Sequence, residues 1–201
     1  MARFIVIESL DGVGKTTLVR NLTAALDGIA MSMPGPAIKP LREQIHSVLG
    51  DARIAHALFY LAIAAAEGAR ARAAADAGRT VVMDRFLAST IAYARARGVD
   101  ADFDALLPAL PRPDVSVLLT LDEDERIRRL GARGEMSTAD IQSLDPVFRG
   151  VVMAELGARC DLQVDVTGAD EEEAVRRVIE EVGVVLKSGN KSIALAYVNR
   201  T

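Results

Sequence analysis

The stretch that decides the fold is Phe4-Ile-Val-Ile-Glu-Ser-Leu-Asp-Gly-Val-Gly-Lys-Thr-Thr17, close to the N-terminus. Its first four residues are apolar and mostly β-branched, which predicts a buried strand over 4–7. A turn containing two glycines follows. From Lys15 to Leu26 the apolar residues then recur at the spacing of a helix. The order strand, glycine turn, helix is the start of an α/β fold.

The turn itself, Ser9-Leu-Asp-Gly-Val-Gly-Lys-Thr16, nearly matches G-x-x-x-x-G-K-[ST], with Ser9 in place of the first glycine. In such a turn the backbone N–H groups bind phosphate oxygens, and glycines let the backbone approach closely. Lys15 would add a positive charge at the β- and γ-phosphates, and the hydroxyl of Thr16 would face Mg²⁺. We therefore expect a phosphate-binding loop here.

Further along the chain, strands and helices alternate. Four more apolar runs predict strands, at 29–33, 80–83, 115–121 and 162–166. Helical spacing is found over 39–49, 52–77, 86–97, 123–135, 139–159 and 170–187. This alternation predicts an α/β fold, a five-stranded parallel sheet with helices on both faces. Together with the phosphate-binding loop after the first strand, it indicates the P-loop NTPase type. Residues 1–187 form one predicted domain, and 188–201 are a tail without an assigned role.

The charge, the apolar stretches and the cysteine content of the chain limit the kinds of partner and compartment that we expect. The chain has 201 residues, with 24 Lys and Arg against 28 Asp and Glu, so its formal net charge is -4. That balance disfavours a nucleic-acid coat protein. No apolar stretch is long enough for a signal peptide or a membrane span. The single cysteine, Cys160, suits a reducing compartment, and we expect a cytoplasmic protein.

Several segments resemble the thymidylate kinase family of nucleoside monophosphate kinases. Residues 7–17 are similar to the family's loop, including Asp11. The segment Asp84-Arg-Phe-Leu-Ala-Ser-Thr-Ile-Ala-Tyr93 resembles the family's Asp-Arg-Tyr…Ser…Ala-Tyr pattern, and Leu58-Phe59-Tyr60 resembles its Leu-Phe pair. The stretch 129–134 resembles the start of the family's lid, which we place near 133–142, and 164–172 resembles its closing strand and helix. The resemblance covers roughly residues 3–186.

The resemblance implies transfer of the ATP γ-phosphoryl group to a nucleoside monophosphate, with dTMP as the favoured acceptor, Mg²⁺ as the metal and a homodimer as the assembly. It implies that ATP is held by Asp11, Gly12, Gly14, Lys15, Thr16, Thr17 and Arg129. The acceptor would contact Asp11, Phe59, Ile63, Arg85, Ser89 and Tyr93. Lys15, Arg85 and Arg133 would be catalytic, and Thr16 and Asp84 would hold the metal.

This chain departs from the family pattern mainly on the acceptor side. Ile63 stands where the family has an arginine that reads the base, and Ser32 stands where it has an arginine in an Arg-Glu-Pro-Gly segment. Neither the phosphate loop nor the stretch from Glu135 to Gln142 contains an arginine. A different small-molecule acceptor therefore stays open as an alternative, with Lys39 or Arg42 as replacement phosphate contacts.

Plainer interpretations stay open too. The chain could bind a nucleotide without turnover. Asp84 could be only a helix cap, and Arg85 only an ion-pair residue. Phe59 and Tyr93 could be packing residues. Arg126 and Arg128 could lie on a solvated helix face, paired with the neighbouring acidic residues Glu123, Asp124 and Glu125.

Overall fold

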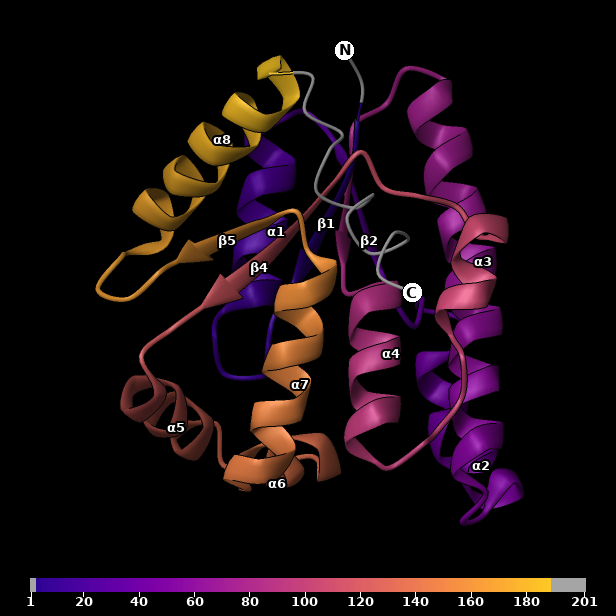
Figure 1. Cartoon of the computed structure of the whole chain (residues 1–201). Coiled ribbons are helices and arrows are strands. Elements are labelled where there is room, and N and C mark those ends of the chain that lie inside the picture. The colour runs from indigo at the N-terminus through magenta and orange to yellow at the C-terminus, as the bar shows by residue number, and fades with distance from the viewer. Residues whose placement is uncertain (1–2, 189–201) are drawn as a thin grey trace.

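The computed structural model describes residues 3–188. Within them, five parallel strands form one sheet in the order β2-β3-β1-β4-β5 (Figure 1). The strands are β1 (Phe4–Glu8), β2 (Ile29–Ser32), β3 (Val81–Asp84), β4 (Val115–Thr120) and β5 (Leu162–Asp165). The predicted five-stranded parallel sheet is confirmed, and each strand lies within two residues of its predicted bounds.

The α-helices of the described residues are α1 (Lys15–Ala25), α2 (Arg42–Leu49), α3 (Arg53–Asp76), α4 (Leu87–Ala96), α5 (Glu123–Ala132), α6 (Thr138–Leu144), α7 (Pro146–Arg159) and α8 (Glu171–Ser188). Short 3-10 helices cover Lys39–Leu41 and Asp104–Ala109. Helix α4 packs between α3 and α7, while α1 packs against α8 (Figure 1). No helix of residues 3–188 is long and apolar enough to cross a membrane.

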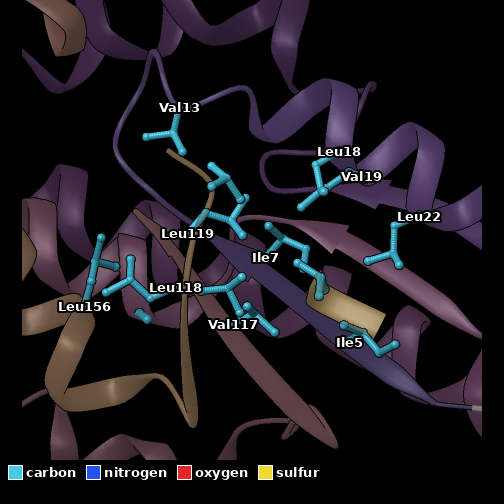
Figure 2. Packing of buried hydrophobic residues seen from close by; sticks show 14 of the residues in the cluster. Ile5, Ile7, Val13, Leu18, Val19, Leu22, Val117, Leu118, Leu119 and Leu156 are labelled. Carbon is cyan, nitrogen blue, oxygen red and sulfur yellow. The ribbon is translucent and has the colours of Figure 1, made fainter. Parts of the chain in front are cut away.

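Strand β1 is buried along its whole length because it lies between β3 and β4 and is covered on both faces. Successive side chains of a strand point to opposite faces. Accordingly Ile5 and Ile7 join the cluster that contains the apolar side of α1, whereas Phe4 and Val6 join the cluster around α3. Figure 2 shows Ile5 and Ile7 below Leu18, Val19 and Leu22 of α1. The apolar run therefore anchors the phosphate loop to the core.

The helices differ from the prediction by more than one residue in three places. The single helix expected over 139–159 is two helices, α6 and α7, separated at Asp145. Pro146 has no N–H to continue a helix and disfavours helical geometry at the residue before it. Asp145 is extended instead, and its carboxylate accepts hydrogen bonds from Val147 N at 2.8 Å and Phe148 N at 2.9 Å. The pair Asp145-Pro146 is therefore the local sequence signal for the break between the two helices.

The other two differences are smaller. Residues 39–41 form a 3-10 turn ahead of α2, with Pro40 inside it, so the α-helix begins at Arg42. Helix α5 ends at Ala132 rather than 135, and Gly134 adopts a left-handed φ of 84° just beyond it. We assigned no structure to Asp104–Ala109, which is helical. Most of the predicted tail, residues 189–201, lies outside the described residues.

The parallel sheet brings together the carboxyl ends of β1 and β3, which are far apart in the sequence. Ile7 of β1 pairs in register with Asp84 of β3, and β4 lies on the other side of β1. After β1 the chain continues to β2 on one side of β1, and after β3 it crosses to β4 on the other side. The carboxyl end of β1 is therefore a topological switch point. Ligands of open α/β sheets bind at such points. The loop after β1 and the residues after β3 both lie there.

Candidate active site

The phosphate loop is shaped by two glycines in left-handed conformations, Gly12 with φ 94° and Gly14 with φ 97°. Gly14 is the N-cap of α1 and provides no side-chain hydrogen bond to the helix. The first N–H groups of α1 therefore remain available to an anion, and the positive end of the helix dipole favours one. Gly12 is also required for steric reasons, because a Cβ on Gly12 would lie 2.9 Å from Cγ of Arg126.

Lys15, Thr16 and Asp84 meet at the start of α1. Lys15 Nζ lies 2.6 Å from Asp84 Oδ1, and the Thr16 hydroxyl donates to Asp84 Oδ2 at 3.1 Å. The Lys15 side chain is only 7 % exposed. Burial lowers the pKa of Lys15, the charge of Arg85 adds to that effect, and the charge of Asp84 opposes it. A hydroxyl and a carboxylate side by side are the hard oxygen ligands that Mg²⁺ prefers, so this pair fits a magnesium ion.

Arg85 forms the second half of the site. Its guanidinium donates to Asp11 Oδ1 at 2.7 Å, to the carbonyl of Ser9 at 2.9 Å and to the Ser89 hydroxyl at 3.1 Å. Burial of Asp11 opposes its ionisation, but the charges of Arg85, Lys15 and Arg133 and the hydrogen bond from Arg85 together lower the pKa of Asp11. The arginine is thereby joined to the phosphate loop on one side and to α4 on the other.

Glu8 is a site residue that the sequence analysis missed. It is fully buried at the end of β1 and accepts hydrogen bonds from Phe86 N at 2.9 Å and Ser89 N at 3.2 Å, and a short one from the Ser89 hydroxyl. Phe86, the N-cap of α4, gives that helix no side-chain cap, so Glu8 supplies it from a neighbouring strand. Burial raises the pKa of Glu8, against the opposing effects of Ser89 and Arg85. The available signal was a charge directly after an apolar strand.

The ring of Tyr93 lies beside two guanidinium groups. Its centre is 5.4 Å from Cζ of Arg85 and 5.5 Å from Cζ of Arg97. Arg97 in turn donates to Oε1 of Gln142, on α6, at 2.9 and 3.2 Å. The Tyr93 hydroxyl is buried near the Arg85 guanidinium, but it makes no hydrogen bond of standard geometry to any of residues 3–188. A buried hydroxyl without such a hydrogen bond is suited to a polar group of a ligand.

Phe59 and Ile63 lie on α3, in the apolar cluster that also contains Met33 and Phe86. Phe86 directly follows Arg85, so this cluster borders the arginine. Ile63 is 8 % exposed and offers no polar atom. The wall of α3 therefore presents hydrocarbon where the resemblance led us to look for a base-reading residue.

The arginines of α5 differ widely in their surroundings. Arg129 donates to Glu125 at 2.8 Å and to the carbonyl of Val13 at 3.4 Å, which brings it to the phosphate loop. The charge of Arg133 contributes to the lowered pKa of Asp11, after the larger effects of burial, Arg85 and Lys15. Arg128 is exposed and paired with Glu125, as the solvated-face alternative expected.

For Arg126 that alternative is wrong. Its side chain is 1 % exposed and packs against the phosphate loop. Thr17 follows Thr16 in the first turn of α1 and is partly buried. The structure thus gathers Asp11, Lys15, Thr16, Asp84, Arg85, Ser89 and Tyr93 at one end of the sheet, with Arg129 at its edge.

A parallel sheet of this strand order, with a lysine-bearing glycine loop after β1 and a partly buried Asp84-Arg85 sequence at the end of the neighbouring strand β3, defines a P-loop nucleoside monophosphate kinase. The comparisons with known proteins agree. The sequence model of the family described as thymidylate kinase matches residues 7–178, and the chain belongs to this family. Its members phosphorylate nucleoside monophosphates with ATP as the phosphate donor.

Relatives align over most of the chain. It is 32 % identical over 151 residues to a probable thymidylate kinase of Pyrococcus abyssi, covering 68 % of this chain and 74 % of the relative. It is 30 % identical over 203 residues to the thymidylate kinase of a Synechococcus strain, covering 89 % and 97 %. The solved thymidylate kinase of Candida albicans shares the fold with a TM-score of 0.71 and 22 % identity, covering 94 % of this chain and 93 % of that one.

Proposed function

We propose that this protein transfers the γ-phosphoryl group of ATP to dTMP, giving ADP and dTDP. The observation that carries the proposal is that the Lys15–Asp84–Thr16 cluster lies beside the Arg85–Asp11 pair. One group suits the donor phosphates and the other suits an acceptor monophosphate. The relatives named thymidylate kinase favour dTMP as that acceptor.

In this proposal a phosphate oxygen of dTMP attacks the γ-phosphorus of ATP, and the bond from that phosphorus to the β–γ bridging oxygen breaks. Phosphoryl transfer needs positioning and neutralisation of charge more than covalent catalysis. Lys15 and the amides of the loop neutralise the donor phosphates, while Arg85 orients the acceptor phosphate. A magnesium ion at Thr16 and Asp84 would neutralise further phosphate charge.

The remaining roles follow from the contacts of these residues. Arg85 is bonded both to Asp11 and to Ser89, so the acceptor's sugar at Asp11 and its phosphate at Arg85 would keep a fixed relation to each other. The buried hydroxyl of Tyr93 suits the same acceptor. Arg129, at the loop carbonyl of Val13, and Arg133 would approach the donor phosphates. Phe59 would stack on the base.

Lys15→Ala is the direct test. Removing a charge that stabilises the transition state should reduce kcat by about 10²- to 10³-fold, measured as dTDP formed from dTMP and MgATP. Arg20→Ala is the matched control, because Arg20 lies on the same helix and is exposed and paired with Glu171. Its rate should equal that of the unmodified protein. A Lys15→Ala variant that keeps the full rate would contradict the proposed function.

A second acceptor is favoured by one observation, the buried apolar side chain of Ile63 at the position where the family has an arginine that reads the base. A site built to hydrogen-bond a substrate rejects analogues strongly, whereas an apolar pocket discriminates weakly. The Candida albicans enzyme, similar in fold, is described as having broad substrate specificity. Steady-state kinetics with dTMP, dUMP, dCMP, dGMP, UMP and thymidine decide between the two, since a clear preference for dTMP would exclude the broader acceptor range.

We also propose that the protein acts as a homodimer in the cytoplasm. The supporting observation for the dimer is a set of exposed apolar side chains on neighbouring parts of α2 and α3, namely Val48, Ile54 and Leu58. Apolar patches of this kind mark protein–protein contacts. The cytoplasmic location rests on the single cysteine of the chain.

A further inference from the structure

Arg126 of α5 is the largest side chain among the fully buried ones of residues 3–188. A guanidinium has five N–H donors, and here each has a partner. Nε and one terminal nitrogen donate to the two carboxylate oxygens of Glu123 at 2.7 and 2.8 Å. The same terminal nitrogen donates to the carbonyl of Ser143 at 3.1 Å. The other donates to the carbonyl of Asp11 at 3.0 Å and to the Ser143 hydroxyl at 3.1 Å.

These partners belong to three separate parts of the chain. Asp11 is in the phosphate loop, Glu123 is one turn earlier on α5, and Ser143 is on α6. Ser143 is itself fully buried, and its hydroxyl donates to the carbonyl of Asp140 at 2.7 Å. The contact with α6 thus includes both the backbone and the side chain of Ser143. A single guanidinium joins the loop that would hold ATP to Ser143 of α6, which lies 17 positions after Arg126.

The hydrocarbon part of the Arg126 side chain packs against the same phosphate loop. A Cβ on Gly12 would lie 2.9 Å from Cγ of Arg126 and 3.0 Å from its backbone oxygen. The hydrocarbon part therefore covers Gly12 while the guanidinium holds the carbonyl of Asp11. Neither the loop nor this turn of α5 can shift without disturbing the other, because close-packed interiors do not deform continuously.

Helix α6 is also held from the opposite direction. Gln142, next to Ser143, accepts two hydrogen bonds from Arg97 at the end of α4. Arg97 stacks on Tyr93, which lies on the proposed acceptor side. Helix α6 is consequently bonded on one side to Arg97, which stacks on Tyr93, and on the other to Arg126 of α5, which in turn holds the phosphate loop.

We propose that Arg126 is a positioning residue that couples the phosphate loop to α6, so that nucleotide in the loop and the placement of α6 depend on each other. Arg126 acts through the carbonyl of Asp11 and through Ser143, and it does not itself touch the substrates. Displacing either partner would leave a buried charge with unsatisfied donors, which is strongly unfavourable. The phosphate loop and α6 therefore keep one fixed position relative to each other. The inference rests on the proposed function only in requiring that the loop bind ATP.

Arg126→Lys is the test variant. Lysine keeps the positive charge next to Glu123 but lacks the planar fork that reaches three segments at once. Arg128→Lys is the matched control, since Arg128 lies on the same helix, is 69 % exposed and makes a similar pair with Glu125. For each protein, amide hydrogen exchange of residues 138–144 is measured with and without MgATP, together with kcat and KM for ATP.

We expect MgATP to slow exchange in α6 of the unmodified protein and of Arg128→Lys. In Arg126→Lys, MgATP should still slow exchange in the phosphate loop but no longer in α6. The value of kcat/KM for ATP should fall roughly 10²-fold, the cost of a misplacement of about 1 Å at a reacting centre. A purely structural role for Arg126 would lower the melting temperature without separating the loop from α6.

Ser143→Ala provides a milder variant if Arg126→Lys does not fold, because it leaves the contacts of Arg126 with Glu123 and Asp11 in place. It should weaken the effect of MgATP on α6. The coupling is refuted if MgATP protects α6 equally in the variants, or does not protect it in the unmodified protein. Failure of the proposed function looks different: dTMP would not be phosphorylated, while MgATP would still protect α6 in an Arg126-dependent way.

Discussion

Asp84 and Arg85 are neighbours in the sequence, yet they face different halves of the candidate site. Asp84 continues β3 and meets Lys15, whereas Arg85 adopts a left-handed φ of 66° and turns toward Asp11. A non-glycine residue in that conformation costs roughly 1–2 kcal/mol. Such strain persists where surrounding contacts determine it, and it gathers at functional sites. The hydrogen bonds from Arg85 to Ser9, Asp11 and Ser89 supply those contacts here.

At the scale of this residue, Arg85→Lys should fold but bind the acceptor poorly. Lysine cannot reach Asp11, the Ser9 carbonyl and the acceptor phosphate together. We expect kcat/KM for dTMP to fall by about 10²-fold, with a smaller change in KM for ATP. Steady-state kinetics with each substrate varied in turn measure this. Equal losses toward both substrates would argue against an acceptor role.

The Asp11–Arg85 pair also predicts a pH dependence of stability. The folded-state pKa of Asp11 is lowered from 3.8, so its contribution is present above that pH and lost as the pH falls through the folded-state pKa. Asp11→Asn lacks this contribution at every pH. The difference in free energy of unfolding between the two proteins should therefore shrink as the pH falls from about 5 toward 2. Urea unfolding over that pH range measures this difference in free energy. A difference that stays constant with pH would contradict a stabilising contribution from the ionised Asp11–Arg85 pair.

At the scale of elements, two glycine-to-alanine substitutions test the contact of α5 with the phosphate loop. Gly12→Ala combines a left-handed φ with a Cβ only 2.9 Å from Cγ of Arg126, so it should lower the free energy of unfolding by more than about 1 kcal/mol and reduce ATP binding. Gly131→Ala, within α5, meets nothing within 4 Å and should raise stability by about 0.5–1 kcal/mol. Urea unfolding and calorimetry with MgATP report both effects, and a harmless Gly12→Ala would contradict the packing described.

Helix α6 illustrates how a short element is held by its ends. Ser137 and Asp140 form a capping box at its start: Asp140 N donates to the Ser137 hydroxyl at 3.2 Å, and Ser137 N donates to the Asp140 carboxylate at 2.8 Å. Seven residues are too few for a stable isolated helix. Its stability therefore depends on the cap and on its contacts with Arg97 and Arg126.

At the scale of the whole molecule, the proposed homodimer gives a direct prediction. Leu58 is 52 % exposed on α3 near other exposed apolar residues, so Leu58→Glu should convert a dimer to a monomer by placing a charge in the contact. Light scattering at micromolar concentration measures the mass. Glu172→Gln, on α8 away from this surface, is the control and should leave the mass unchanged. A monomeric unmodified protein would contradict the dimer.

Local patterns determined much of this protein. The apolar runs, the glycine turn and Lys15-Thr16 predicted the sheet and its loop correctly, because strands and phosphate loops have short-range signatures. Asp145-Pro146 also contained the signal for the break between α6 and α7. The assembly of Asp11, Asp84 and Arg85 followed from the parallel sheet, since the carboxyl ends of its strands lie at one edge.

Only the tertiary structure decided the roles of Glu8 and Arg126. Glu8 caps a helix whose N-cap residue, Phe86, lies 78 residues later, and Arg126 donates to a carbonyl 115 residues earlier. In the sequence, Arg126 resembles its exposed neighbour Arg128, with a carboxylate three positions before each. What separates them is the packing of α5 on Gly12, which removes one guanidinium from water and leaves the other solvated. Burial of that kind depends on residues far away in the chain, so no local pattern encodes it.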